Sequence, residues 1–133
     1  MKFLLDTNIC IYLIKQRPPE VLQKFRTCQV GDIGISSITV AELEFGVQKS
    51  QFPNKNHQAL RKFLLPLQVA DFNSAAADAY GIIRAMLEKK GTPIGSLDTL
   101  IAAHALSLEV VLVTNNEKEF SRVPNLKLDN WVN

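Results

Sequence analysis

Short apolar runs alternate with amphipathic segments along the whole chain. Apolar runs bounded by turn or polar residues predict buried strands, and apolar residues that recur every three or four positions predict helices. The pattern gives strands at 2–5, 33–36, 67–70 and 110–113, a short last strand at 126–128, and helices at 7–17, 19–25, 39–50, 56–65, 74–90 and 95–108. Such alternation favours a mostly parallel sheet with helices on both faces. We expect a three-layer α/β/α fold in a single domain over 1–133.

Capping residues sharpen several of these boundaries. Thr39 followed three residues later by Glu42 has the capping-box pattern and is expected to open the third helix. Asn73 is a good cap for the long helix, which Gly91 and Pro93 end.

The composition is that of an ordinary globular domain. The chain has 133 residues, 47% of them hydrophobic and 21% charged, and no apolar run approaches the ~20 residues of a membrane span. One lysine and a short apolar run at the N-terminus do not make a secretory signal. We therefore expect a cytoplasmic protein that does not enter membranes.

Cysteine and histidine chemistry is excluded by number and spacing. Cys10 and Cys28 form no C-x-x-C pair and are expected to be reduced packing residues. His57 and His104 are too isolated for a zinc site or an acid–base pair, and His104 is expected to be a packed or surface helix residue. Any metal must then be held by oxygen. The net charge of +2 does not identify a nucleic-acid binder, although 15 Lys and Arg permit a local basic patch.

Acidic side chains occur where predicted strands end and predicted helices begin. These points meet at one edge of a parallel sheet, where such folds hold their ligands. The candidates are Asp6, Glu42, Asp98 and the pair Asn115-Asn116. Each acid also has a purely structural explanation, Asp6 as a cap, Glu42 in the capping box and Asp98 as a first-turn acid favoured by the helix dipole.

The repulsion between carboxylates separates a shared function of these acids from independent roles as helix caps. Two carboxylates ~4 Å apart repel by about 4 kcal/mol at an effective dielectric near 20, whereas a helix N-terminus returns only ~0.3–1 kcal/mol per acid. A cluster must therefore hold protons or bind a cation. Oxygen-only ligands suit Mg²⁺ or Mn²⁺, and we favour the cation.

Taken together and in this order, four segments resemble a known family. They are Leu5-Asp6-Thr7-Asn8, Ser36-Ser37-Ile38-Thr39-Val40-Ala41-Glu42-Leu43, Gly91-Thr92-Pro93-Ile94-Gly95 before Asp98, and Val113-Thr114-Asn115-Asn116. Over essentially its full length the chain resembles the PIN-domain ribonucleases, and among them the VapC toxins of bacterial VapBC toxin–antitoxin modules.

The resemblance implies an activity, a cofactor and partners. It implies the toxin of a type II toxin–antitoxin module, an endoribonuclease that uses Mg²⁺, with Mn²⁺ expected to substitute. It also implies a homodimer that a VapB-type antitoxin inhibits in a larger assembly. Similar toxins act on transfer RNA, including the initiator. Asp6, Glu42 and Asp98 match the family's acids, whereas Asn116 occupies the position where the family often has a fourth.

These roles agree with the chemistry of the residues. Asp6 and Asp98 would be the metal ligands, and Glu42 would orient the attacking water or bind the metal through one. Thr7, Asn8 and Asn116 would contact either the metal-binding side chains or the scissile phosphate. Candidates for contacts to the RNA backbone, with solvated surface as the alternative for each, are Lys15, Arg17, Arg84, Lys118 and Arg122.

Two alternatives stay open at this point. The chain could be a PIN-type nuclease of RNA processing that has no antitoxin. It could also be a non-catalytic nucleic-acid or protein-binding module whose acids only cap helices. Site-specific binding of Mg²⁺ or Mn²⁺ separates the second alternative from the nucleases.

Overall fold

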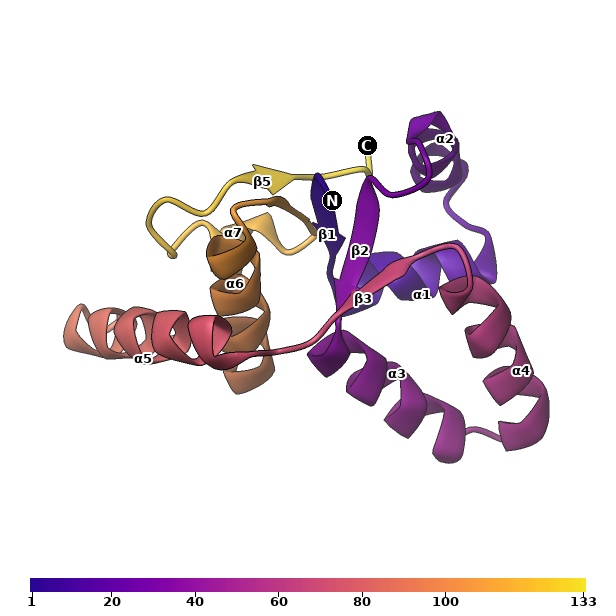
Figure 1. The fold of residues 1–133 in the computed structure, drawn as a ribbon, viewed down its shortest axis with the longest axis horizontal. Coiled ribbons are helices and arrows are strands. Elements are labelled where there is room, and N and C mark those ends of the chain that lie inside the picture. Colours follow the sequence, from indigo (N-terminus) through magenta and orange to yellow (C-terminus); the bar gives the residue numbers. More distant parts are fainter.

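The computed structural model describes residues 1–133 as three layers around a five-stranded sheet (Figure 1). All neighbouring strands are parallel, in the order β3-β2-β1-β4-β5. The strands are β1 (Phe3–Leu5), β2 (Ile33–Ser36), β3 (Gln68–Ala70), β4 (Val111–Val113) and β5 (Leu128–Asp129). The predicted α/β/α class and parallel sheet are confirmed.

Helices cover both faces of this sheet. In Figure 1, α5, α6 and α7 lie on one side of the strands and α1 to α4 on the other. The helices are α1 (Thr7–Lys15), α2 (Pro19–Thr27), α3 (Ser37–Gln48), α4 (Pro53–Leu64), α5 (Ser74–Lys89), α6 (Ser96–Leu108) and α7 (Glu117–Phe120).

Successive residues of β1 serve two different cores because side chains alternate across a strand. Leu5 packs in one buried cluster with α1 to α4, and Trp131 near the C-terminus completes it. Leu4 packs in a second cluster with α5 and α6, together with Leu112 of β4. The two cores are thus joined through the central strand.

The register of the sheet aligns the residues that follow the strands. Leu5 pairs with Val113, and the amide of Asp6 donates to the carbonyl of Val113 at 3.0 Å. Leu4 pairs with Gly34 of β2, so Asp6 is level with Ser36 on one side and Thr114 on the other. This row of three polar residues is the edge on which the candidate site is built.

Several predicted boundaries are off by one to three residues, and one helix is missing from the prediction. The fourth helix begins at Pro53 rather than 56, and the last strand covers Leu128–Asp129 rather than 126–128. The third helix begins at Ser37 because Ser36, at the end of β2, already accepts a hydrogen bond from the amide of Ile38 at 3.0 Å. Thr39 is therefore a buried residue of the first turn, not the cap, and the capping box does not form. The four-residue helix α7 was not predicted.

Candidate active site

Asp6 follows β1, and its two carboxylate oxygens have different partners. Oδ1 accepts from the amide of Ile9 at 2.9 Å, so Asp6 is the N-cap of α1. Oδ2 accepts from the hydroxyl of Thr114 at 2.5 Å. Burial raises the pKa of Asp6, although both hydrogen bonds oppose this. Since a carboxylate oxygen has about two lone pairs, both oxygens can still accept a further ligand.

Glu42 lies beside the start of α1. The hydroxyl of Thr7 donates to its Oε1 at 2.8 Å, and the hydroxyl of Thr39 lies 3.5 Å from that of Thr7. The charge of Glu42 also contributes to the raised pKa of Asp6. Because Glu42 is not part of a capping box, the structural explanation that the sequence offered for it falls away.

Asp98 is half-buried in the first turn of α6. Burial is the main reason why its pKa rises to about 6, and the nearby charges of three other carboxylates raise it further. In decreasing order of effect these charges belong to Glu119, Asp6 and Glu42. The structure thus brings the three predicted acids into one electrostatic environment.

Glu119 of α7 is the fourth acid of this cluster and was not among the residues predicted from the sequence. Its Oε1 accepts from the amide of Gly95 at 2.6 Å and its Oε2 from the side-chain amide of Asn116 at 2.8 Å. These hydrogen bonds lower the pKa of Glu119, so its charge is retained beside Asp98. The spacing Asn116-x-x-Glu119, a helix-start pattern, was the available signal.

The predicted outer residues lie beside the acids in different ways. The side-chain amide of Asn116 donates to Glu119. Its backbone amide donates to the hydroxyl of Thr114 at 2.9 Å. Asn8 is exposed, and its backbone amide lowers the pKa of Asp6. Thr114, fully buried and not among the predicted site residues, links Asn116 to Asp6 by two successive hydrogen bonds.

Two of the five predicted RNA-contact residues already have partners within the protein. The guanidinium of Arg84 is already engaged by Glu88 at 3.1 Å and by the hydroxyl of Tyr80 at 2.8 Å. Arg122 donates to the carbonyl of Pro93 at 3.0 Å, and its charge lowers the pKa of Glu119. The other predicted cations, which form no salt bridge, are Lys15, Arg17 and Lys118.

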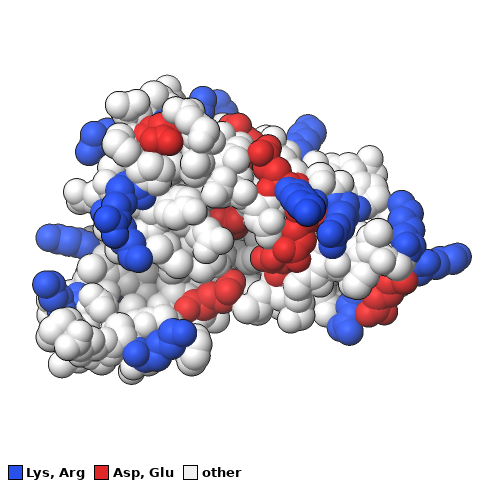
Figure 2. All heavy atoms as spheres, turned by 180° about the vertical axis from the view of Figure 1, so that it is seen from behind, with Lys and Arg blue, Asp and Glu red and all other residues white.

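A groove leads away from the acids between α1, α3 and α4. It encloses about 440 Å³, and Thr7, Glu42 and Lys15 are among the residues that line it. Figure 2 shows acidic side chains gathered beside the hollow in the middle of this face and basic side chains around its rim. Of the clustered acids, Glu42 is the one that lines this groove.

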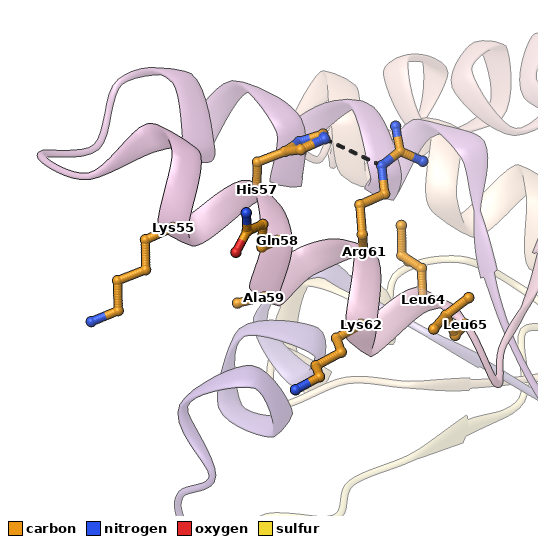
Figure 3. Close-up of a pocket in the computed structure, with 8 residues that line it drawn as sticks. All are labelled: Lys55, His57, Gln58, Ala59, Arg61, Lys62, Leu64 and Leu65. Carbon is orange, nitrogen blue, oxygen red and sulfur yellow. Dashed lines mark hydrogen bonds between the residues drawn. The ribbon is translucent and has the colours of Figure 1, made fainter.

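A larger hollow, of about 800 Å³, lies on the outer face of α4 and carries no carboxylate. In Figure 3, Lys55 and Lys62 extend to one side of this helix, and the opposite side holds Arg61, whose Nε lies 3.5 Å from Nε2 of His57. Its basic lining suits an anion rather than a cation. This hollow therefore lacks the ligands of a metal site, which the sheet edge provides.

The donor set at the sheet edge suits a hard cation. No three acidic, histidine or cysteine side chains stand close enough together to enclose an ion by themselves. Mg²⁺ is commonly held by one or two carboxylates, with waters completing its shell, so Asp6 and Asp98 are a sufficient pair. Burial, and after it the charges of the neighbouring carboxylates, raise the pKa of Asp98, and a bound cation would offset both effects.

Comparisons with known proteins identify the family of this chain. The PIN domain family matches residues 3–126. The chain is 44% identical to the tRNA(fMet)-specific endonuclease VapC of Shigella flexneri, with 98% of each chain covered. It is 46% identical to the ribonuclease VapC2 of Haemophilus influenzae, with 99% of each covered. None of its helices has both the length and the apolar character needed to cross a bilayer.

Solved structures extend the likeness to the fold. A chain of the VapBC2 complex from Rickettsia felis, bound to a DNA fragment from its promoter, superposes with a TM-score of 0.92. It shares 44% identity, with 98% of this chain and 99% of that chain covered. A chain of the DNA-bound VapBC complex from Salmonella typhimurium gives a TM-score of 0.93 at 43% identity, with 98% of each covered. The present chain therefore belongs to the PIN-domain family, among the VapC ribonucleases.

Proposed function

We propose that this ribonuclease is a divalent-cation-dependent endonuclease whose site is the carboxylate cluster at the end of β1. The observation that carries the proposal is the convergence of Asp6, Glu42, Asp98 and Glu119 at this edge, where burial and the charges of the other three acids raise the pKa of Asp98 to about 6. Such a cluster destabilises the fold unless a cation or protons compensate it. The cofactor is Mg²⁺, with Mn²⁺ as its substitute.

Each acid has a role that follows from its surroundings. Asp6 and Asp98 hold the cation, because Asp6 directly follows β1 and Asp98, in the first turn of α6, lies near enough for the charge of Asp6 to raise its pKa. Glu42, held by Thr7 at 2.8 Å, orients the attacking water. Glu119 adds the fourth negative charge and is itself fixed by Asn116. When bound, the cation supplies charge stabilisation for the phosphoryl oxygens of the scissile bond.

The substrate is RNA, and we infer transfer RNA from the named specificity of the Shigella flexneri relative. Lys15 lines the groove beside Glu42, and Lys118 is exposed on the site helix α7, so both are placed for phosphate contacts. Arg17 lies at the far end of α1 with Lys15. Arg84 and Arg122 would have to release or share their present partners.

The biological setting follows the same relatives. We propose that residues 1–133 form a single PIN domain that acts in the cytoplasm as the toxin of a toxin–antitoxin module. The superposed structures are complexes of VapC-like chains with their VapB partners. By analogy, this chain would form a homodimer, and a VapB-type antitoxin would bind it in a larger assembly.

Substitution of single ligands tests the site. Asp6→Asn and Asp98→Asn remove one charge each, and asparagine can still cap α1, so the fold should persist. Cleavage of initiator transfer RNA in Mg²⁺ should fall at least about a hundredfold, since outer-shell partners alone are worth 10–100-fold. Glu117 lies on the same edge but accepts a hydrogen bond from Asn130. Glu117→Gln is therefore the matched control and should cleave normally.

The product ends test the reaction itself. Since no histidine pair is available to deprotonate a ribose hydroxyl, water is the expected nucleophile. The fragments should then carry 5′-phosphate and 3′-hydroxyl ends, read by adaptor ligation with and without phosphatase. A folded Asp98→Asn chain that cleaves at the normal rate, or fragments ending in 2′,3′-cyclic phosphate, would contradict the proposal.

A further inference from the structure

His104 is a buried histidine of α6 with one close polar partner. It is 1% exposed, and its Nδ1 lies 2.8 Å from the hydroxyl oxygen of Ser36. The ring of Phe72 meets the imidazole edge to face, with 5.3 Å between the ring centres. Burial lowers the pKa of His104, so the imidazole is neutral at pH 7.

The surroundings of the imidazole favour Ser36 as the donor in this hydrogen bond. The hydroxyl of Ser36 accepts from the amide of Ile38 at 3.0 Å, as the cap of α3, and has one proton to give. The backbone of Asp71 raises the pKa of His104 and favours a proton on Nε2, although Nε2 has no hydrogen-bond partner. We therefore infer that Nδ1 is unprotonated and accepts from Ser36.

This contact joins the two helices that carry Glu42 and Asp98. It is the only hydrogen bond between α6 and either α3 or its cap. Ser36 precedes Glu42 by six residues, and His104 follows Asp98 by six, which is about 9 Å along each helix. The remaining contacts of α6 are largely apolar, and apolar contacts are not directional. A hydrogen bond fixes both a distance and an angle.

We propose that His104, acting through Ser36, is a positioning residue that sets the spacing of α3 and α6 and thereby of Glu42 and Asp98. The proposal rests on the proposed function, since it concerns the same carboxylates. Catalytic groups need to be held within about 0.5 Å of their working geometry, usually by residues that do not touch the substrate. His104 is such a residue on the α6 side, and Thr114 is its counterpart for Asp6.

Three substitutions of His104 separate the hydrogen bond from simple packing. Asparagine places an acceptor oxygen at the same number of bonds from Cβ as Nδ1, so it can still receive the proton of Ser36. Glutamine has the same amide one bond further out and cannot reach that position without displacement. Leucine fills the space without an acceptor. His104→Asn should therefore behave like the natural chain, and the other two should not.

The spacing can be measured without metal or RNA. Phe45 of α3 and Leu97 of α6 are 66% and 45% exposed, so cysteines there accept spin labels. Cys28→Ser provides the background, since Cys10 is buried. Labelled chain diluted into excess unlabelled chain reports distances within one molecule by electron–electron double resonance. His104→Leu and His104→Gln should broaden the distance distribution, and His104→Asn should leave it narrow.

The consequence for the site is measured by calorimetric titration of Mn²⁺ and by RNA cleavage. We expect about a tenfold weaker Mn²⁺ affinity for the leucine and glutamine variants, the lower end of the effect of outer-shell partners. Their kcat should fall at unchanged KM for RNA, because the RNA contacts are intact. His104→Asn should restore both values.

Different failures have different meanings. If the folded glutamine variant keeps the narrow distribution and the natural Mn²⁺ affinity, or if asparagine fares no better than glutamine, the positioning role is overturned. If His104→Leu does not fold, the comparison of His104→Asn with His104→Gln still tests the positioning role. Absence of Mn²⁺ binding in the natural chain would overturn the proposed function, while the distance measurement would still judge the link between α3 and α6.

Discussion

The carboxylate of Asp6 has two oxygens, and a different neighbour engages each of them. Capping of α1 uses Oδ1 and the hydrogen bond from Thr114 uses Oδ2. The structural and the chemical explanations for this residue are therefore compatible, because capping occupies only part of the acceptor capacity of a carboxylate. The same capping also fixes the orientation of the side chain before any ligand binds.

Proton release by Asp98 predicts how metal affinity depends on pH. A cation binds the ionised carboxylate, so below the pKa of about 6 it must displace a proton. The affinity for Mn²⁺ should be about tenfold weaker at pH 5 than at pH 7, measured by calorimetry in two buffers of different ionisation enthalpy. Equal affinities at both pH values, with no proton release, would contradict the assignment of Asp98 as a ligand.

Protonation of Asp98 should also make the stability of the metal-free chain depend on pH. The pKa of Asp98 rises from 3.8 to about 6 on folding, so the proton favours the folded state. This contribution is fully present below about pH 4 and is lost as the pH rises through about 6. Asp98→Asn should flatten that dependence and raise the melting temperature at pH 7 by about 2–4 °C. Thermal melts by circular dichroism with a chelator present test this.

At the scale of elements, short helices and caps decide what reaches the site. α3 begins two residues before the expected cap, because Ser36 at the end of β2 supplies the capping oxygen itself. α7 has only four residues, yet it carries Glu119 to Gly95 at the start of α6. Both details depend on where a strand ends, so they link the sheet edge directly to the acids.

Two glutamates of α7 allow a matched test. Glu119 is the largest source of charge acting on Asp98, whereas Glu117 accepts from Asn130 on the other side of the helix. Glu119→Gln should lower the pKa of Asp98 towards 3.8 and weaken Mn²⁺ binding, since one negative charge is lost. Glu117→Gln should change neither. Carbon-detected NMR titration of the aspartate carboxyls gives the pKa, and coincident effects of both substitutions would count against Glu119 as the fourth acid.

At the scale of the molecule, one sheet separates two cores that share their central strands. Trp131, the only tryptophan, belongs to the core with α1 to α4, where its ring meets Phe3 at 5.7 Å. Leu87 of α5 belongs to the opposite core and is 1% exposed. Because Leu4 and Leu5 are consecutive residues of β1, neither core can lose its packing without disturbing the other.

This arrangement predicts cooperative unfolding of a single domain. Leu87→Ala should destabilise the chain by about 2–5 kcal/mol, as buried leucine truncations do. Although Trp131 lies on the other face, its fluorescence should report the same reduced urea midpoint as the far-ultraviolet circular dichroism. Separate midpoints for the two signals would show that the two sides of the sheet unfold independently, against a single domain over 1–133.

The sequence by itself determined the elements that short-range physics controls. The strands, the helix capped by Asn73 and the position of Asp6 at the end of a strand all follow from periodicity, capping and turn residues within a few positions. The parallel sheet follows from the alternation of these elements. The sequence also indicated Asp6, Glu42 and Asp98 together, because parallel strands present their carboxyl ends at one edge.

Only the tertiary structure decided which side chains complete that edge. The hydrogen bonds of Glu119 to Gly95, of Ser36 to His104 and of Thr114 to Asp6 join residues 24, 68 and 108 positions apart. Such contacts depend on strand order and register, which local propensity does not contain. The sequence thus determined where the acids would gather, and the fold decided which partners hold them there.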